Sequence, residues 1–490
     1  MGQAGKRGLM LAAALVVAAA AAPAEEVLTK QYQDGGIYEG TFKDGKQDGH
    51  GKYRLPSGYE YEGDWKAGEI AGQGRARFPD GSIYEGHFTR GKPDGRGKIT
   101  YPDGGTYEGD WVAGEITGTG VALYANGTRY EGRFANALHD GTGVLTGPDG
   151  YRYEGDWVQG VKQGRGKITY PDGARYEGEM AGGQRAGRGK LILKTGVTYE
   201  GDWKGGRMEG QGVLLQPNSD RYEGAMVAGK RQGKGRVTYA NGDLYEGEFL
   251  ADKPQGQGHF RGADGYDYTG GWVEGRIEGT GRAQFPDGSV YEGAFRNDMP
   301  EGQGRITYPD GASYEGGWVA GNIAGRGLAR YANGLVYEGE FLEARQHGKG
   351  RMTYPDGYVY DGDWADGTRQ GHGRALHPDG TIYEGGFEAG QRSGLGKLIR
   401  PDGFTYDGMW RDGEIDGPGK AIYANGDVYE GNFVHGRRQG KGVMRYASGK
   451  VAGGTWAEDR LAEPAEPLPP PPPPPSPPPQ PQAQPPGSPD

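Results

Sequence analysis

Aromatic side chains recur along this sequence at positions from which their faces could stack on a sugar ring, a lipid tail or a peptide. All nine tryptophans occupy one phase of a repeating pattern, four residues after a position that is Tyr in every complete copy. If such a stripe were exposed to solvent, its length would make it an interaction surface. The candidate stripe comprises Tyr61, Trp65, Tyr107, Trp111, Tyr153, Trp157, Trp203, Trp272, Trp318, Trp364 and Trp410.

The same stripe has a second interpretation that needs no ligand. Six tryptophans are followed eleven residues later by Ala, as Trp65 is by Ala76, whereas copies with Phe have larger residues there, such as Ile99. A large residue opposite a small one is what interdigitated packing requires. We therefore interpret the stripe as the core of a one-layer sheet, covered by coiling or by a second copy of the chain in a homodimer. Ligand binding is the alternative.

Basic side chains form a second candidate site. Lys230 and Arg231 stand at the same phase of the pattern as Arg437 and Arg438. We expect these residues to lie in loops along one edge, where they could contact lipid phosphates at about 1 kcal/mol for each nearby charge. Other copies carry an acidic and an apolar residue at this phase, such as Glu69-Ile70, so the basic row is interrupted.

Catalytic and metal-binding patterns are absent from the sequence. The eight histidines fall at scattered phases, and the only close pair, His372 and His377, has Asp379 beside it without forming a convincing site. The Glu that follows most repeat tyrosines could bind cations, but pairing with basic residues across strands, such as Glu108 near Lys98, also explains it. We predict no enzyme activity, no catalytic or metal residues and no cofactor.

The elements that carry these residues are short repeats. A Tyr-Glu-Gly triplet, with occasional substitutions, returns every 23 residues from Tyr38 to Tyr429, and a degraded copy follows with Ala452 in the Tyr place. A fixed short period without insertions indicates an array in which each unit contacts only its neighbours. Such an array presents a long surface and offers no recessed catalytic pocket.

Each repeat reads as a β-hairpin. Counting from the repeat Tyr as position 0, Gly occupies positions 2, 11 and 13, and Pro-Asp-Gly or Ala-Asn-Gly ends most copies. Asp-Gly and Asn-Gly between β-rich runs are strong turn signals. We expect a second, longer turn over positions 7 to 11. The fold class is therefore all-β, an elongated single-layer antiparallel sheet of tandem 23-residue hairpins, a solenoid or rod.

The two ends of the chain differ from the array. Lys6 and Arg7 precede an apolar run that closes with Ala22-Pro23-Ala24, the pattern of an export signal with cleavage after Ala24. We divide the chain into a signal peptide (1–24), a lead-in (25–37), the array (38–460) and a Pro-rich disordered tail (461–490). We interpret the tail as a stiff spacer, and a docking motif for a proline-recognising domain is the alternative. The protein is then exported to a periplasm or to the extracellular space.

Composition limits the partners. The formal net charge is −10, and an acidic chain without a basic stripe is a poor ligand for nucleic acid. The chain has no Cys, which excludes disulfides and thiolate metal sites. Glycine accounts for 101 of the 490 residues, but its strict periodicity argues against low-complexity disorder within the array.

The repeat resembles the MORN (membrane occupation and recognition nexus) repeat, in an exported bacterial type. A clean copy runs from Tyr107 to Gly114 and continues with Gly118 and Gly120. The resemblance implies a sheet of hairpins used for protein scaffolding and, in some members, for membrane or phospholipid association. Kinase and methyltransferase domains follow the array in some families, but nothing outside this array is long enough to be one.

We therefore expect a non-enzymatic scaffold of the cell envelope that presents an extended surface to protein partners. The alternative is direct binding to anionic phospholipid membrane or cell-wall glycan through the basic residues and the aromatic stripe.

Overall fold

A computed structural model describes residues 26–464, and every regular element in this range is a β-strand. The predicted signal peptide and nearly all of the predicted tail lie outside the described residues. The strands are β1 (Leu28–Gln31), β2 (Ile37–Lys43), β3 (Lys46–Arg54), β4 (Glu60–Lys66), β5 (Glu69–Arg77), β6 (Ile83–Thr89), β7 (Lys92–Thr100), β8 (Thr106–Val112), β9 (Glu115–Leu123), β10 (Arg129–Ala135), β11 (Leu138–Thr146), β12 (Arg152–Val158), β13 (Val161–Thr169), β14 (Arg175–Ala181), β15 (Gln184–Ile192), β16 (Thr198–Lys204), β17 (Arg207–Leu215), β18 (Arg221–Val227), β19 (Lys230–Thr238), β20 (Leu244–Leu250), β21 (Lys253–Arg261), β22 (Asp267–Val273), β23 (Arg276–Gln284), β24 (Val290–Arg296), β25 (Met299–Thr307), β26 (Ser313–Val319), β27 (Asn322–Arg330), β28 (Val336–Leu342), β29 (Arg345–Thr353), β30 (Val359–Ala365), β31 (Thr368–Leu376), β32 (Ile382–Glu388), β33 (Gln391–Ile399), β34 (Thr405–Arg411), β35 (Glu414–Ile422), β36 (Val428–Val434), β37 (Arg437–Arg445), β38 (Val451–Ala457) and β39 (Arg460–Pro464).

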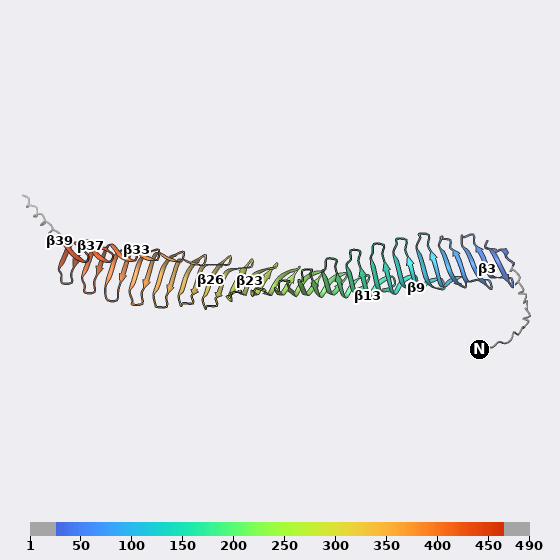
Figure 1. Ribbon diagram of the computed structural model, residues 1–490, viewed down its shortest axis with the longest axis horizontal. Helices are drawn as coiled ribbons and strands as arrows, with labels where there is room; N and C mark the ends of the chain where they lie inside the picture. Colours follow the sequence, from blue (N-terminus) through green and yellow to red (C-terminus); the bar gives the residue numbers. More distant parts are fainter. Residues whose placement is uncertain (1–25, 465–490) are drawn as a thin grey trace, which may run out of the picture. The chain divides into compact units, whose positions relative to one another are not determined.

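Two compact units divide the chain. The first ends at Ala240 and adds Phe249–Asp252, and the second contains Asn241–Glu248 and continues from Lys253. Within each unit, successive strands stand side by side in chain order (Figure 1) and pair antiparallel, as β4 does with β5 and β5 with β6. The prediction of an all-β fold built from an open antiparallel sheet of tandem hairpins is confirmed.

One hairpin, β4 and β5, illustrates the repeat. Its turn consists of Ala67 and Gly68 alone, with φ of 52° and 93°, as a two-residue hairpin with both turn residues at positive φ requires. A non-glycine residue in this region costs about 1–2 kcal/mol, but its N–H is satisfied, because Ala67 donates to Asp48 Oδ2 of the preceding repeat at 3.0 Å. The longer turn that we predicted over positions 7 to 11 is therefore wrong.

The glycine at position 11 lies in a β-bulge instead. In the β4–β5 pair, Gly63 faces Gly74 and Trp65 faces Ile70, so one residue of β4 opposes three of β5. The extra residues include Gly72, whose φ is 92°. Asp64, the residue opposite the bulge, accepts a hydrogen bond from the N–H of Gln73 at 2.8 Å. The bulge thus has its own side-chain partner, and it bends the strand next to the core.

The glycines at positions 2 and 13 make room for the repeat tyrosine. Gly63 and Gly74 face each other across the strands, and a Cβ on Gly74 would overlap the Tyr61 ring. With the ring over this pair, Tyr61 is only 2% exposed, and its hydroxyl donates to the carbonyl of Asp64 at 3.0 Å. A single layer can therefore bury a tyrosine per repeat without a second layer above it.

Candidate interaction faces

The predicted aromatic stripe lies in the core of each unit. Exposure of its tryptophans ranges from 4% at Trp157 to 8% at Trp272, and Tyr153 is fully buried. The rings form an edge-to-face series: Tyr84 contacts Phe88 of its own repeat at 5.0 Å between ring centroids and Trp111 of the next repeat at 5.1 Å. The aromatic contacts thus join neighbouring repeats.

Indole hydrogen bonds join the repeats as well. Trp364 Nε1 donates to the carbonyl of Gly350, the position 13 glycine of the preceding repeat, at 2.9 Å. The same bond is made by Trp65, Trp111, Trp157, Trp203, Trp318, Trp410 and Trp456. Trp272 is the exception, because its buried Nε1 has no hydrogen-bond partner among the described residues.

Residues at position 9 cover the stripe. The two-residue turn brings each of them opposite the aromatic at position 4, as Ile70 is opposite Trp65. In six repeats this residue is a cation over one or more rings: Lys162, Arg185, Arg231, Arg369, Arg392 and Arg438. Sequence reasoning missed this row, since it had assigned these residues to a loop. Counting strand pairs from a two-residue turn would have found it.

The four predicted phosphate-contact residues are therefore in strands and not in loops. Lys230 and Arg231 begin β19, and Arg437 and Arg438 begin β37. Arg231 lies 5.3 Å from the Phe249 ring centroid and donates through Nη2 to the carbonyl of Asp252 at 2.6 Å. Lys230 is exposed.

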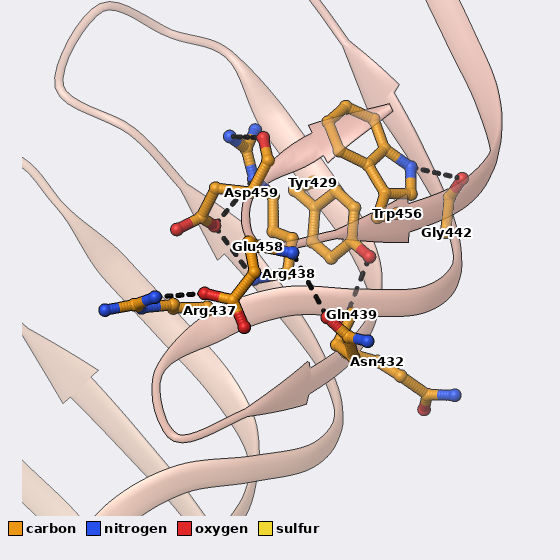
Figure 2. Close-up of polar contacts among 9 residues, drawn as sticks. All are labelled: Tyr429, Asn432, Arg437, Arg438, Gln439, Gly442, Trp456, Glu458 and Asp459. Atoms are coloured by element: carbon orange, nitrogen blue, oxygen red, sulfur yellow. Dashed lines mark hydrogen bonds and ion pairs between the residues drawn. The ribbon is translucent and has the colours of Figure 1, made fainter. Parts of the chain in front are cut away.

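Figure 2 shows the equivalent contacts in the last repeats. Arg437 forms an ion pair with Glu458, and Arg438 forms one with Asp459 at 3.1 Å while its guanidinium lies 4.7 Å from the Trp456 ring centroid. Arg231, Arg437 and Arg438 thus already have partners within the chain, and a phosphate would have to compete with them.

The opposite face of the sheet carries charged side chains. The Glu that follows most repeat tyrosines faces a residue at position 14 of the preceding repeat, which is often Lys or Arg. Lys52–Glu62, Arg75–Glu85 and Lys167–Glu177 form ion pairs at 3.1, 3.2 and 3.2 Å. Between 46% and 69% of each side chain is exposed, so each pair contributes at most about 1 kcal/mol. We call this surface, which contains the residues at positions 1, 3, 12 and 14, the charged face.

Hollows with glycine floors lie on the charged face. In the first unit, a hollow of about 800 Å³ around Gly97, Gly109 and Gly120 is flanked by Lys98 and Glu108. A second, of about 670 Å³, shares Glu131 and Gly132 with the first and extends to Arg188. The second unit has a hollow of about 630 Å³ between Gln303 and Asp361. Positively and negatively charged side chains therefore surround a floor of glycine backbone.

Within residues 26–464, the titratable groups do not form a catalytic arrangement. His139 is half-buried over the core, stacked on Tyr130 at 3.6 Å between ring centroids, and burial lowers its pKa to about 4. Burial likewise raises the pKa of Tyr84 to about 12. The backbone N–H of Thr119 donates to Asp110 and holds the pKa of that carboxyl below its usual range. These shifts follow from packing and from the bulge described above.

The two closest histidines in the sequence are engaged separately. The His372 N–H donates to Asp363 Oδ2 at 2.8 Å, whereas the His377 ring contacts Tyr358 at 4.9 Å. Over residues 26–464 no group of three or more His, Cys, Asp or Glu side chains could hold a metal ion. The same part of the chain contains no helix with the length and hydropathy of a membrane span.

Comparison with known proteins decides the family. The MORN repeat pattern matches residues 38–58, 61–83, 84–106, 107–129, 130–150, 153–175, 176–198, 199–221, 222–244, 245–265, 268–290, 291–313, 314–336, 337–357, 360–382, 383–405, 406–428 and 429–451. The chain belongs to the MORN repeat family. MORN repeats generally mediate association with proteins or membranes, and an architecture of repeats alone suggests a non-enzymatic protein.

Individual relatives of this MORN protein are distant. Alsin of Rattus norvegicus is 43% identical over 49 residues, which is 9% of this chain and 3% of Alsin. Among solved structures, the SAS-4 (dCPAP) TCP domain of Drosophila melanogaster is 16% identical over 32% of this chain and 89% of that domain, with a TM-score of 0.22. The E1021V mutant of the Danio rerio CPAP TCP10 domain is 15% identical over 50% of this chain and 99% of that domain, with a TM-score of 0.19. Scores this low carry no argument about ligands.

Proposed function

We propose that this MORN protein is a non-enzymatic scaffold of the cell envelope that holds partner proteins along its charged face. One observation carries the proposal. The aromatic stripe and most of the cations over it are used in packing, whereas the charged face presents exposed charged side chains around glycine-floored hollows. A partner segment that carries charges of both signs and runs across the strands would meet a glutamate in each repeat of the first two hollows, and a cation wherever position 14 is Lys or Arg.

The predicted export signal supports the location. Lys6, Arg7 and the apolar run up to Ala24 are the features of a secreted chain, so the scaffold would act in a periplasm or outside the cell. N-terminal sequencing of the mature protein tests this part. A mature chain that begins at Glu25 supports it, and a chain that keeps Met1 in the cytoplasm overturns it.

Binding to anionic membrane or cell-wall glycan, and homodimerisation through the stripe, have less support. Trp65 and Trp111 are 7% and 6% exposed within a single chain, so the stripe offers little surface to a lipid, a sugar or a second copy. Of the four basic residues proposed for phosphate contact, only Lys230 lacks a described ion pair or ring contact. Co-sedimentation with anionic vesicles and with purified wall sacculi, read together with Trp emission, tests this alternative.

Photo-crosslinking in the producing cell tests the scaffold itself. A photoreactive residue replaces Val144, which lines the second hollow of the charged face, and the matched control replaces Val112, which is 57% exposed beside a hairpin turn. We expect discrete protein adducts from position 144, and we expect the substitution Glu154→Lys in the same hollow to remove them. Adducts from position 112 alone, or none from either position, would contradict the proposal.

A further inference from the structure

A hollow of about 870 Å³ lies where the repeats end, on the aromatic face of the second unit. Its lining includes Phe404, Tyr423, Tyr446, Trp456 and Leu461. Tyr423 and Tyr446 are both half-buried and occupy the same position in consecutive repeats, 23 residues apart. The hollow therefore presents two aromatic rings at the spacing of the repeat.

The degraded last repeat explains why space remains here. In the β35–β36 pair Ala421 faces Tyr429, whereas in the β37–β38 pair Met444 faces Ala452, which stands where every complete repeat has Tyr. Met444 therefore has no tyrosine ring on its β38 side, whereas on its other side it faces Tyr429 of β36.

The residue that lies over the half-buried tyrosine also changes at the last repeat. The Arg438 guanidinium lies 5.9 Å from the Tyr423 ring centroid, but the equivalent neighbour of Tyr446 is Leu461, which carries no charge. At the last repeat the hollow therefore lacks one tyrosine ring and one cation that the preceding repeat has, and its lining combines aromatic rings with polar side chains such as Asp427, Asp459 and Arg460.

We propose that the proline segment Pro469–Pro475 of this same chain docks in this hollow as a polyproline II helix. The segment lies outside the described residues, and the proposal does not depend on the scaffold function. Proline-rich segments dock in aromatic-lined grooves because their conformation is already formed, which lowers the entropy lost on binding. A run of seven consecutive prolines is the strongest segment of that kind in the sequence.

The length of one turn of a polyproline II helix matches the length of one repeat of the sheet. A polyproline II helix has three residues per turn and rises by about 3.1 Å per residue, so one turn advances about 9.3 Å. Neighbouring strands lie about 4.8 Å apart, so one repeat of two strands advances about 9.6 Å. Prolines on one side of the helix therefore meet Tyr423 and Tyr446 in succession, one turn for each repeat.

Chain connectivity favours this occupant over a separate molecule. The last strand, β39, ends at Pro464, and only Ala465–Leu468 separate it from the proline run. Five residue steps reach about 16 Å in the extended polyproline conformation, and a tether this short gives an effective concentration in the millimolar range. Arg460 and Leu461 of β39 line the hollow themselves, so the segment starts beside its site. Glu466 in the tether complements Arg460, which makes no ion pair with any residue from 26 to 464.

Distance measurement between two spin labels on the full chain tests the docking. The chain contains no Cys, so Ser476→Cys and Lys450→Cys place one label after the proline run and one on an exposed turn residue beside the hollow. The labelled protein is diluted with unlabelled chain so that only intramolecular distances are recorded. We expect one narrow distance peak, whereas a tether that leaves the helix undocked gives a distribution tens of ångströms wide.

Two sets of variants decide what the peak means. The double variant Tyr423→Ala, Tyr446→Ala should lose the narrow peak, while Tyr101→Ala, Tyr124→Ala, at the same position of two repeats in the first unit, should retain it. Replacement of all seven prolines by Ser leaves the hollow intact and should also lose the peak. A broad distribution in the parent chain overturns the proposal, as does a peak that survives the Tyr423 and Tyr446 substitutions. If the narrow peak appears only in a mixture of singly labelled molecules, the distance is between two chains. That result overturns docking within one chain and assigns the hollow to a second copy.

Discussion

Trp364 donates a hydrogen bond through Nε1 to the carbonyl of Gly350, 14 residues earlier in the preceding repeat, at 2.9 Å. The donor is 6% exposed, and its acceptor belongs to one of the glycine pairs over which a repeat tyrosine lies. A single bond thus ties the aromatic stripe of one repeat to the backbone of its neighbour. Trp272 occupies the same position without the bond, which provides a comparison inside the same molecule.

The first prediction uses this comparison. Trp364→Phe removes a net hydrogen bond of about 1 kcal/mol together with some packing, whereas Trp272→Phe removes similar packing and relieves an unsatisfied buried donor. We expect Trp364→Phe to destabilise its repeat by about 1–2 kcal/mol more than Trp272→Phe does. Amide hydrogen exchange in β29 and β30, compared with β21 and β22, measures this locally, which suits an array without a single unfolding transition. Equal losses at the two sites would show that the indole bond contributes nothing.

The second prediction concerns the glycine pairs. A Cβ on Gly97 would overlap the Tyr84 ring, which is fully buried and cannot move aside without losing its contacts with Phe88 and Trp111. We expect Gly97→Ala to cost about 2–3 kcal/mol through overpacking, seen as loss of exchange protection in β6 and β7. The control is Gly453→Ala, where the nearest atom to a new Cβ is Val443 Cγ2 at 3.5 Å. A cost below 1 kcal/mol at Gly97 would mean that the ring does not lie over the glycine pair.

Much of this architecture follows from the sequence, and the failures have a common cause. The 23-residue period, the Pro-Asp-Gly turns and the Trp–Ala matching predict hairpins with one aromatic face. The tight turn was missed because Ala67 adopts φ of 52°, and Ala gives no sequence signal for that conformation. With the turn misplaced, Arg231 and Arg438 were assigned to an edge loop. The covering role of position 9 and the tyrosine over each glycine pair are properties of strand register, which spacing alone did not fix.

The third prediction is a pH dependence. Burial lowers the pKa of His139 to about 4 in the folded chain, below the 6.5 of an ordinary His. Below pH 6.5 the unfolded chain therefore binds a proton that the folded chain does not, so local stability falls from pH 6.5 to about 4 and then levels off. Because the ring is only half-buried, we expect a loss of about 1 kcal/mol.

A neutral substitute for His139 exists in the chain itself. Gln346 stands at the same position and donates through Nε2 to Tyr331 Oη at 2.6 Å, as His139 Nε2 is hydrogen-bonded to Tyr124 Oη at 2.7 Å. His139→Gln should keep that bond and remove the acid-dependent loss in β10 and β11, measured by hydrogen exchange at pH 7 and pH 4.5. A loss of the same size in parent and variant would place the acid sensitivity elsewhere.

The fourth prediction separates a packing role from a lipid-binding role for Arg438. Its guanidinium lies 4.7 Å from the Trp456 ring centroid, its Nη2 donates to the carbonyl of Asp459 at 2.7 Å, and its Nε pairs with the carboxylate of the same residue. Arg438→Lys keeps the charge but loses the planar stacking and the fork of donors, so we expect a cost of about 1 kcal/mol in β37 and β38. Arg438→Ile places at this position the residue that covers Trp65, and it should cost less than Arg438→Lys while removing the charge.

If Arg438 instead binds lipid phosphate, Arg438→Lys should retain vesicle pelleting and Arg438→Ile should lose it. Exchange rates and pelleting measured on the same two variants therefore give opposite rankings under the two roles, and we expect the packing order.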